Sequence, residues 1–196
     1  NPFYANYKYE SVKLAKKFSG DKETLQFGSF NIECIHIPGH TPGSMAYILE
    51  IWGKKILFGG DLPGIAINII DGNLNDYINS MQKLLTLDID ISCEGHEKVI
   101  EPQDKIRKYI KGYIEFNKDL NSVVLENPTN KEAILNLALQ SYEIEWYSSV
   151  VDFCNYLLEI DPNNSDAIQL LEKAKQKNPP KVEFIKRLIE QNYKGE

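Results

Sequence analysis

The sequence lacks several features that would place it in a broad class of protein. No apolar run approaches the roughly 20 residues that a helix needs to cross a bilayer, so we expect no membrane partner. The opening NPFYANYKYESVKLAKKFSG has neither the apolar core nor the small-residue cleavage site of a secretory signal peptide. The net charge of −6 leaves no excess of basic residues, which argues against a nucleic-acid partner, although a bound metal could supply local positive charge.

The sequence also has few cysteines, and their spacing suggests no disulfide or metal-binding motif. The chain has three cysteines, Cys34, Cys93 and Cys154, and no two of them form a CxxC motif. An odd, widely spaced set is typical of reduced thiols in a cytoplasmic protein. We therefore expect a cytoplasmic location and no disulfide framework.

The first half of the chain has the pattern of an α/β protein. Short runs rich in Ile, Leu and Phe, separated by Gly, Pro and Asn, predict β-strands. The predicted strands are 24–27, 30–37, 45–51, 54–60 and 89–95. Apolar residues at helical spacing predict helices at 7–18 and 73–87, and WGKK at 52–55 is typical of a hairpin turn.

The second half of the chain predicts helices only. Residues 103–126 have the spacing of a long amphipathic helix, and residues 131–164 resemble one tetratricopeptide repeat, followed by helices at 165–178 and 179–193. We divide the chain into an α/β domain at 1–102 and a helical extension at 103–196. A single repeat cannot bury a continuous core. The extension is therefore expected to cover the α/β domain, to form a homodimer, or to bind a protein partner.

Three residues with metal-ligating side chains share one setting. His40, Asp61 and His96 each follow a predicted strand and each stand directly after glycine. Glycine allows tight turns and close approach of the backbone. Nitrogen and carboxylate ligands on adjacent loops at one sheet edge are how zinc and iron sites are built.

The motifs around these residues add a resemblance. PGHTPGS at 38–44, LFGGDLPG at 57–64 and EGH at 94–96 resemble, in this order, the second half of the metallo-β-lactamase superfamily. The resemblance implies the second half of an αββα sandwich, here with an all-α, tetratricopeptide-like extension. It implies that His40 and His96 each bind one of two metals and that Asp61 bridges them. Zinc is the metal implied, with iron or manganese as alternatives.

The sequence also departs from that family. The HxHxDH motif is absent, and His36, His40 and His96 are the chain's only histidines. Each metal would then have two protein ligands, whereas catalytic zinc normally has three and a water. We expect either a truncated copy whose first half lies upstream of Asn1 or a degenerate member. Alone, the chain is expected to be inactive or weakly active.

Four further polar residues near these motifs could have either a structural role or a role at the metal site. Thr41 and Ser44 are expected to brace the turn after His40, and Glu94 is either solvated or hydrogen-bonded behind the ligands. All three are candidates for supporting the metal ligands. His36 shares the alternating face of Ile32 and Cys34, which predicts a hydrogen-bonded core histidine.

Two functions remain open from the sequence. The first is a metal-dependent hydrolase, in which a metal-bound hydroxide attacks an ester, thioester, amide-like or phosphodiester bond of a small-molecule substrate. No catalytic residue beyond the metal ligands is assigned. The alternative is a non-catalytic binding or scaffold protein that presents its helical tail to a partner.

Overall fold

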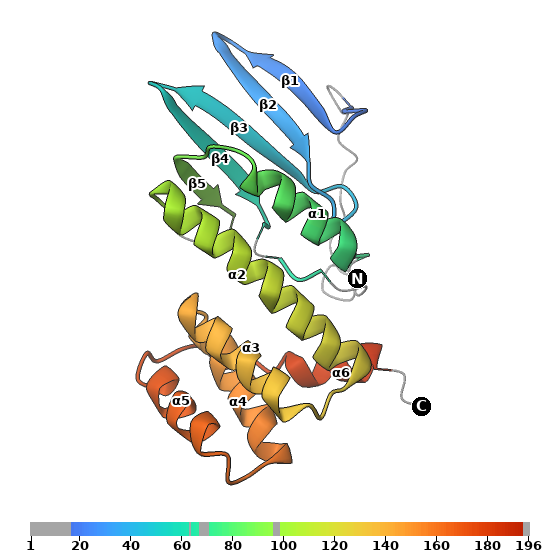
Figure 1. The fold of residues 1–196 in the computed structure, drawn as a ribbon, viewed down its shortest axis with the longest axis vertical. Helices are drawn as coiled ribbons and strands as arrows, with labels where there is room; N and C mark the ends of the chain where they lie inside the picture. The colour runs from blue at the N-terminus through green and yellow to red at the C-terminus, as the bar shows by residue number, and fades with distance from the viewer. Residues whose placement is uncertain (1–16, 63, 67–70, 96–98, 194–196) are drawn as a thin grey trace, which may run out of the picture.

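The protein has a mixed α/β fold, shown in Figure 1. The computed structural model describes residues 17–62, 64–66, 71–95 and 99–193. Five strands form one sheet in chain order. They are β1 (Lys22–Phe27), β2 (Phe30–His36), β3 (Met45–Ile51), β4 (Lys54–Gly60) and β5 (Ile91–Glu94). All five correspond to predicted strands, so the α/β class is confirmed. The helix predicted at 7–18 lies mostly outside the described residues.

The strand directions explain why the candidate ligands can meet. Strands β1 to β4 pair in antiparallel fashion, whereas β5 pairs with β4 in parallel. Strands β2, β4 and β5 therefore run the same way, and their C-terminal ends lie toward one edge of the sheet. The loop with His40 follows β2, Asp61 follows β4, and residue 96 follows β5.

Two helices cover one face of the sheet, as Figure 1 shows. Helix α1 (Leu74–Leu85) begins at Asn73, whose side chain accepts from the N–H of Asp76. Helix α2 (Gln103–Asn121) packs beside it. Their apolar faces and the inward-facing strand residues form one core, because alternate strand side chains point to the same face. Its sheet residues include Ile35, Ala46, Ile48 and Leu57.

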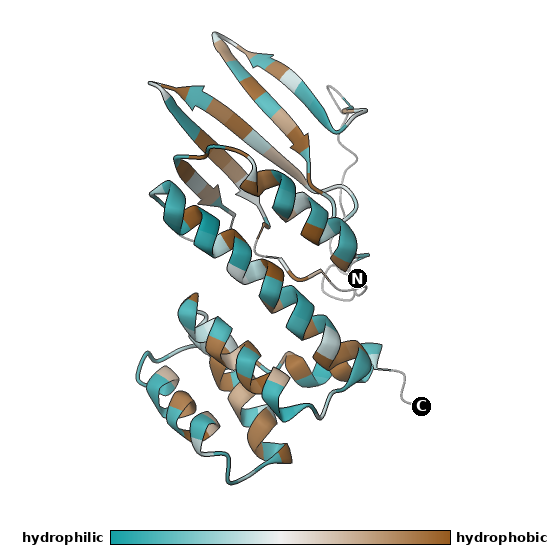
Figure 2. Ribbon diagram, viewed as in Figure 1, coloured by the Kyte–Doolittle hydropathy of each residue, from teal (hydrophilic) through white to brown (hydrophobic). Residues whose placement is uncertain are grey.

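The other face of the sheet carries exposed aromatic residues. Tyr47 on β3 lies opposite Phe58 on β4, and their exposed fractions are 37% and 42%. In the hydropathy view of Figure 2, apolar and polar residues alternate along these strands. At Tyr47 and Phe58, however, the face turned away from the helices also carries large apolar side chains.

The remaining helices form a second core. They are α3 (Lys131–Glu143), α4 (Tyr147–Ile160), α5 (Ser165–Lys175) and α6 (Ile185–Asn192), and a π-helical turn (Ser122–Glu126) continues α2. Ala138 and Val150 are both fully buried within this core. The two helices predicted inside 131–164 are confirmed, while their assignment as a tetratricopeptide repeat stays a prediction. The last helix begins at Ile185, later than the sequence predicted, because Pro179 and Pro180 leave 179–184 without helical hydrogen bonds.

Helix α2 belongs to both cores. Its first half contributes Ile106, Ile110 and Tyr113 to the core under the sheet, and its second half contributes Phe116 and Leu120 to the helical core. The limits 1–102 and 103–196 stay a prediction. Helix α2 lies in the segment 103–196, yet its first half covers the sheet formed by the segment 1–102.

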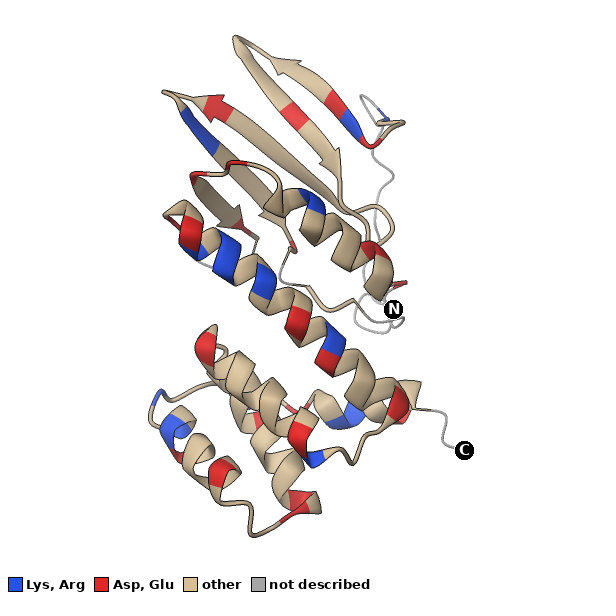
Figure 3. Cartoon of the chain, in the orientation of Figure 1, with Lys and Arg blue, Asp and Glu red and all other residues tan. Residues whose placement is uncertain are grey.

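No helix in the described ranges is both long enough and apolar enough to cross a membrane. Helix α2 carries both basic and acidic side chains in Figure 3.

Candidate functional site

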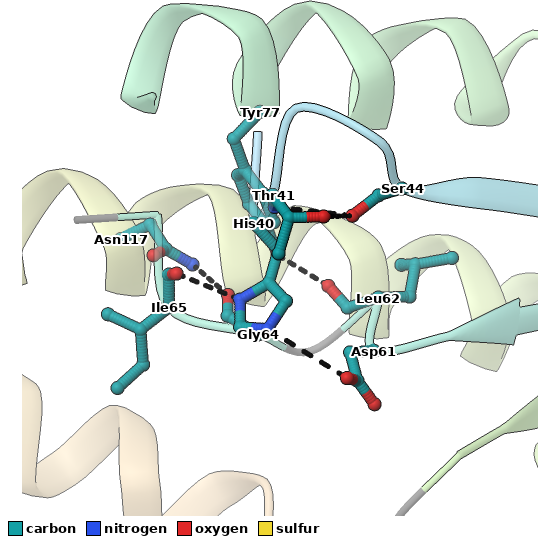
Figure 4. A network of polar contacts seen from close by, with 9 residues as sticks. All are labelled: His40, Thr41, Ser44, Asp61, Leu62, Gly64, Ile65, Tyr77 and Asn117. Atoms are coloured by element: carbon teal, nitrogen blue, oxygen red, sulfur yellow. Dashed lines mark hydrogen bonds and ion pairs between the residues drawn. The ribbon is translucent and has the colours of Figure 1, made fainter. Parts of the chain in front are cut away.

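Two of the three predicted ligands lie together at the sheet edge. His40 Nε2 is 3.8 Å from Asp61 Oδ2. Figure 4 shows the two side chains turned toward each other. The His40 side chain is 21% exposed and that of Asp61 is 49% exposed, so solvent reaches the space between them. His96 lies outside the described residues. The role of all three as metal ligands stays a prediction.

The other ring nitrogen of His40 fixes the tautomer of the imidazole. Nδ1 lies 3.0 Å from the carbonyl oxygen of Ile65. Because a carbonyl oxygen only accepts hydrogen bonds, Nδ1 carries a proton, so in the neutral imidazole Nε2 is the nitrogen with the lone pair. That lone pair is on the nitrogen that faces Asp61.

Glycine allows the backbone to come close to His40 and to α1. A Cβ atom added to Gly64 would lie 2.2 Å from Nδ1 of His40. Gly39 has φ +140°, and a Cβ atom there would lie 2.3 Å from Cα of Tyr77. Gly39 O also accepts from the N–H of Asn73, which joins the loop to the start of α1. These contacts hold His40 between α1 and the segment after Asp61.

Thr41 and Ser44 brace the loop after His40. The two hydroxyl oxygens are 2.9 Å apart, and the N–H of Thr41 donates to Ser44 Oγ at 3.2 Å. Within the described part of the chain, the Thr41 and Ser44 hydroxyls bond to each other rather than to a histidine. His36 donates from Nε2 to the carbonyl of Pro42 at 2.8 Å, so its hydrogen bond was predicted correctly. It is only half-buried, however, because it stands at the end of β2.

The end of β5 reaches the same site. The N–H of Gly95 donates to Gly60 O at 2.7 Å, and a Cβ atom on Gly95 would lie 3.2 Å from Asp61 Oδ1. Glu94 accepts a hydrogen bond from Ser92 Oγ. A Cβ atom on Gly59 would lie 2.6 Å from Glu94 Oε2, so this carboxylate lies against the C-terminal end of strand β4. Glu94 is therefore packed beside the site rather than fully solvated.

The sequence did not single out Tyr77 as part of the site. Its position on the apolar face of α1 predicts a core residue, and it is indeed buried. Its hydroxyl donates to the carbonyl of Leu62 at 2.8 Å. Burial raises the pKa of Tyr77 above its usual range, and Tyr109 and Glu94 add to the rise. Tyr77 therefore stays protonated and fixes the turn that follows Asp61.

A fully buried asparagine from a distant helix was also missed. Asn117 on α2 bonds the backbone on both sides of Ile65, whose carbonyl holds His40 (Figure 4). Asn in a helix interior is unfavourable unless its side chain finds partners. An Asn on the apolar face of a predicted helix is the signal that could have found it.

Two side chains at this edge of the sheet have the donor atoms that a divalent metal prefers. In its neutral form the His40 imidazole turns a lone pair toward the Asp61 carboxylate 3.8 Å away, and a cation between them would stabilise this arrangement. No group of three or more His, Cys, Asp or Glu side chains with ligating geometry occurs among the described residues. His40 and Asp61 thus supply two donors.

Cysteine chemistry does not explain the site. All three cysteines are free thiols, as predicted. Burial raises the pKa of the Cys154 thiol to about 12. Burial and the neighbouring Glu94 also raise the pKa of Cys93. Neither thiol is an activated nucleophile, because nucleophilic cysteines have a lowered pKa.

Two hollows in the surface differ in their chemistry. One of about 190 Å³ is lined by His40, Asp61, Thr41 and Tyr77, among others. A larger one of about 480 Å³ lies between α2 and α3 and does not include the candidate ligands. The smaller hollow is the candidate functional site, because it holds the metal-ligating side chains.

Comparison with known proteins finds partial matches. No protein-family model matches the sequence. Over 79 residues the chain is 38% identical to a hydroxyacylglutathione hydrolase from Haemophilus influenzae, which covers 38% of this chain and 36% of that protein. Over 85 residues it is 32% identical to a hydroxyacylglutathione hydrolase-like protein from Homo sapiens, which covers 40% of this chain and 29% of that protein. The matched part spans about a third of the length of each relative (36% and 29%).

Solved structures give matches at lower identity. A sec-alkylsulfatase from a Pseudomonas species aligns with 88% of this chain and 40% of its own, at 15% identity and a TM-score of 0.47. An archaeal metallo-β-lactamase superfamily protein from Sulfolobus tokodaii aligns with 56% of this chain and 45% of its own, at 20% identity and a TM-score of 0.41. By their names the two sequence relatives are a hydrolase and a hydrolase-like protein, and they support the resemblance to the metallo-β-lactamase superfamily.

Proposed function

We propose that this chain carries part of the active site of a metal-dependent hydrolase of the metallo-β-lactamase type. The observation that carries the proposal is the pair His40 and Asp61, with the Nε2 lone pair facing a carboxylate oxygen 3.8 Å away at the edge of the sheet. When the imidazole is neutral, neither atom can donate to the other, and a divalent cation is a partner that suits both.

In this proposal His40 and His96 would each hold one metal, and Asp61 would contact both. A bound zinc ion would supply a Lewis acid and would lower the pKa of a coordinated water. The chain's own residues do the positioning: Ile65 O holds the proton on His40 Nδ1, and Tyr77 fixes the turn after Asp61. Each metal would have two ligands from this chain, so full activity would require ligands from outside the 196 residues.

The proposed reaction is hydrolysis of an acyl compound. Both sequence relatives are named for hydroxyacylglutathione hydrolysis, which supports an ester or thioester among the bond types open from the sequence. The hollow beside His40 and Asp61 is about 190 Å³, which suits the reacting group of a substrate rather than a whole large molecule.

A zinc titration tests the proposal. Calorimetry at neutral pH should show zinc binding to the unmodified chain, weaker than at a complete three-ligand site. His40→Ala and Asp61→Ala should abolish it. His36→Asn is the matched control, because His36 bonds Pro42 O rather than facing Asp61, and this variant should bind zinc as the unmodified chain does.

The outcomes separate the two candidate functions. Zinc binding that is lost in both ligand variants and kept in the control supports the hydrolase. If the unmodified chain binds no zinc, the metal-dependent hydrolase is wrong for this chain. Tight, stoichiometric binding by the unmodified chain would show that further ligands are already present, and the two-ligand assignment would be wrong.

A further inference from the structure

The segment 64–66 has an unusual position in the molecule. It follows the turn after Asp61 and passes beneath the ring of His40, and its described backbone is neither helix nor strand. Ile65 O accepts from His40 Nδ1 at 3.0 Å. Backbone outside regular structure has no ladder of partners, so the direction of the Ile65 carbonyl depends on what holds the residues beside it.

One side chain holds both neighbours of Ile65. Asn117 Oδ1 accepts from the N–H of Ala66 at 2.7 Å, and Asn117 Nδ2 donates to Gly64 O at 3.3 Å. Nδ2 also donates to Tyr113 O, one helical turn earlier, at 3.0 Å. Asn117 is fully buried, and 51 residues separate it in sequence from Ala66.

A second asparagine extends the contact. Asn121 Nδ2 donates to Ala66 O at 3.3 Å and to Asn117 O at 2.8 Å. Ala66 therefore has both its N–H and its carbonyl bonded by α2. Gly64 is held from two sides, by Asn117 and by the ring of His40. Figure 4 shows Asn117, Gly64, Ile65 and His40 as one connected network.

A purely structural role would require only that the polar groups of 64–66 are satisfied. The observed arrangement does more, because the two bonds from Asn117 lie on either side of the residue whose carbonyl selects the His40 tautomer. His36 provides a contrast within the same chain. Its Nε2 lies 2.8 Å from Pro42 O, so His36 carries its proton on the opposite nitrogen.

We propose, on the basis of the proposed function, that Asn117 is a positioning residue for His40. It holds the Ile65 carbonyl against Nδ1, which keeps the proton there and directs the Nε2 lone pair toward Asp61. Helix α2 also contributes Phe116 and Leu120 to the helical core. The packing of the helical extension thus helps to hold the orientation of a candidate ligand in the α/β part.

The test measures the tautomers of His36 and His40 directly. Two-bond proton–nitrogen NMR correlations on metal-free protein at about pH 8, where an ordinary imidazole is neutral, report which nitrogen is protonated. In the unmodified chain His40 should be protonated at Nδ1 and His36 at Nε2. Asn117→Ala should give a mixture at His40 and leave His36 unchanged.

A matched control separates positioning from lost stability. Asn130 caps α3, because its side chain accepts a hydrogen bond from the N–H of Ala133 rather than from the backbone of 64–66. Asn130→Ala should lower stability and leave both tautomers unchanged. Asn121→Ala, which removes one bond to Ala66 O, should give a smaller change at His40 and serves if Asn117→Ala does not fold. If a folded Asn117→Ala protein keeps His40 in a single Nδ1-protonated form, the inference is wrong. If Asn117→Ala does not fold, the same result in Asn121→Ala would contradict it.

Zinc titration of the same proteins distinguishes this inference from the proposed function. Loss of a partner that orients a ligand typically lowers metal affinity by about 10–100-fold, and we expect that loss in Asn117→Ala and not in Asn130→Ala. An unmodified chain with the expected tautomers that binds no zinc would contradict the proposed function and leave the positioning intact. Equal zinc affinity in the unmodified chain and Asn117→Ala would contradict the role of Asn117.

Discussion

The ring of His40 lies directly against the backbone of Gly64. A Cβ atom at residue 64 would be 2.2 Å from His40 Nδ1, 2.4 Å from its Cγ, and 2.7 Å from the carbonyl oxygen of Asp61. No Cβ atom fits at these distances. The position of the candidate ligand therefore depends on the absence of a side chain 24 residues later in the sequence.

Replacing Gly64 with alanine should displace the His40 ring. Forcing an extra carbon into a close-packed position costs about 1–3 kcal/mol, so we expect a loss of stability of that size together with weaker zinc binding. Chemical denaturation and zinc titration would measure the two effects. Gly43→Ala is the matched control, because Gly43 is in the His40 loop and a Cβ atom there meets nothing within 4 Å. A Gly64→Ala protein with unchanged stability and affinity would contradict the packing argument.

The docking of α6 should depend on Asp152. Its Oδ2 accepts from the N–H groups of Phe184 and Ile185, at 3.0 and 2.9 Å, and so caps the start of α6. Asp152→Ala would leave two backbone donors without this acceptor, which should cost about 1–3 kcal/mol. Asp152→Asn keeps an oxygen that can accept both bonds and should cost much less. Urea denaturation at neutral pH would compare the two variants, and equal losses would contradict a capping role.

The same residue predicts a pH dependence. Burial raises the pKa of Asp152, and Glu183 adds to the rise, although the two N–H bonds lower it in part. A raised pKa in the folded state means that the folded protein binds this proton more tightly than the unfolded chain. Its contribution to stability is therefore present below the unfolded pKa of about 3.9 and is lost as pH rises through the folded value. Lowering the pH from 7 to about 4 should therefore stabilise the unmodified chain relative to Asp152→Asn. Urea denaturation at the two pH values would measure the difference in unfolding free energy, and an unchanged difference would contradict a raised pKa of Asp152.

Removing the helices that follow residue 126 should expose apolar surface on α2. A chain that ends after residue 126 keeps all of α2 but uncovers Phe116, Leu120, Val123 and Val124, each at most 1% exposed in the full chain. Exposed contiguous apolar surface promotes association. We expect aggregation and a lower melting temperature, measured by light scattering and calorimetry. A chain that ends after residue 178 and lacks only α6 should change less. A fragment 1–126 that stays monomeric with unchanged stability would make residues 127–196 an independent module.

The aromatic pair on the open face of the sheet should bind hydrophobic probes. Replacing Tyr47 and Phe58 together with serine should reduce the binding of a fluorescent hydrophobic dye, since both side chains are more than a third exposed and lie opposite each other. Trp52→Ser is the control, because Trp52 is 92% exposed at the β3–β4 turn, at the end of the sheet. Dye binding that falls only in the control would contradict a probe site on this face.

Local sequence pattern determined the elements and the loops that carry the candidate ligands. The strands and α1 were predictable because short apolar runs with glycine and proline at their ends favour strands, and apolar residues at helical spacing favour helices. The placement of His40 and Asp61 after two of these strands was also visible. Given that both strands run the same way, their ends meet at one edge of the sheet.

The tertiary structure alone decided how His40 is held. Its tautomer depends on Ile65 O, the close approach of the ring depends on Gly64, and both are fixed by Asn117 on α2, 77 residues after His40 in the numbering. No local pattern encodes these contacts, because hydrogen bonds between segments far apart in sequence form only when α2 packs across the sheet. The same packing places the first half of α2 in the core under the sheet and its second half in the helical core. The amphipathic pattern of α2 is the same along its length and does not reveal this division.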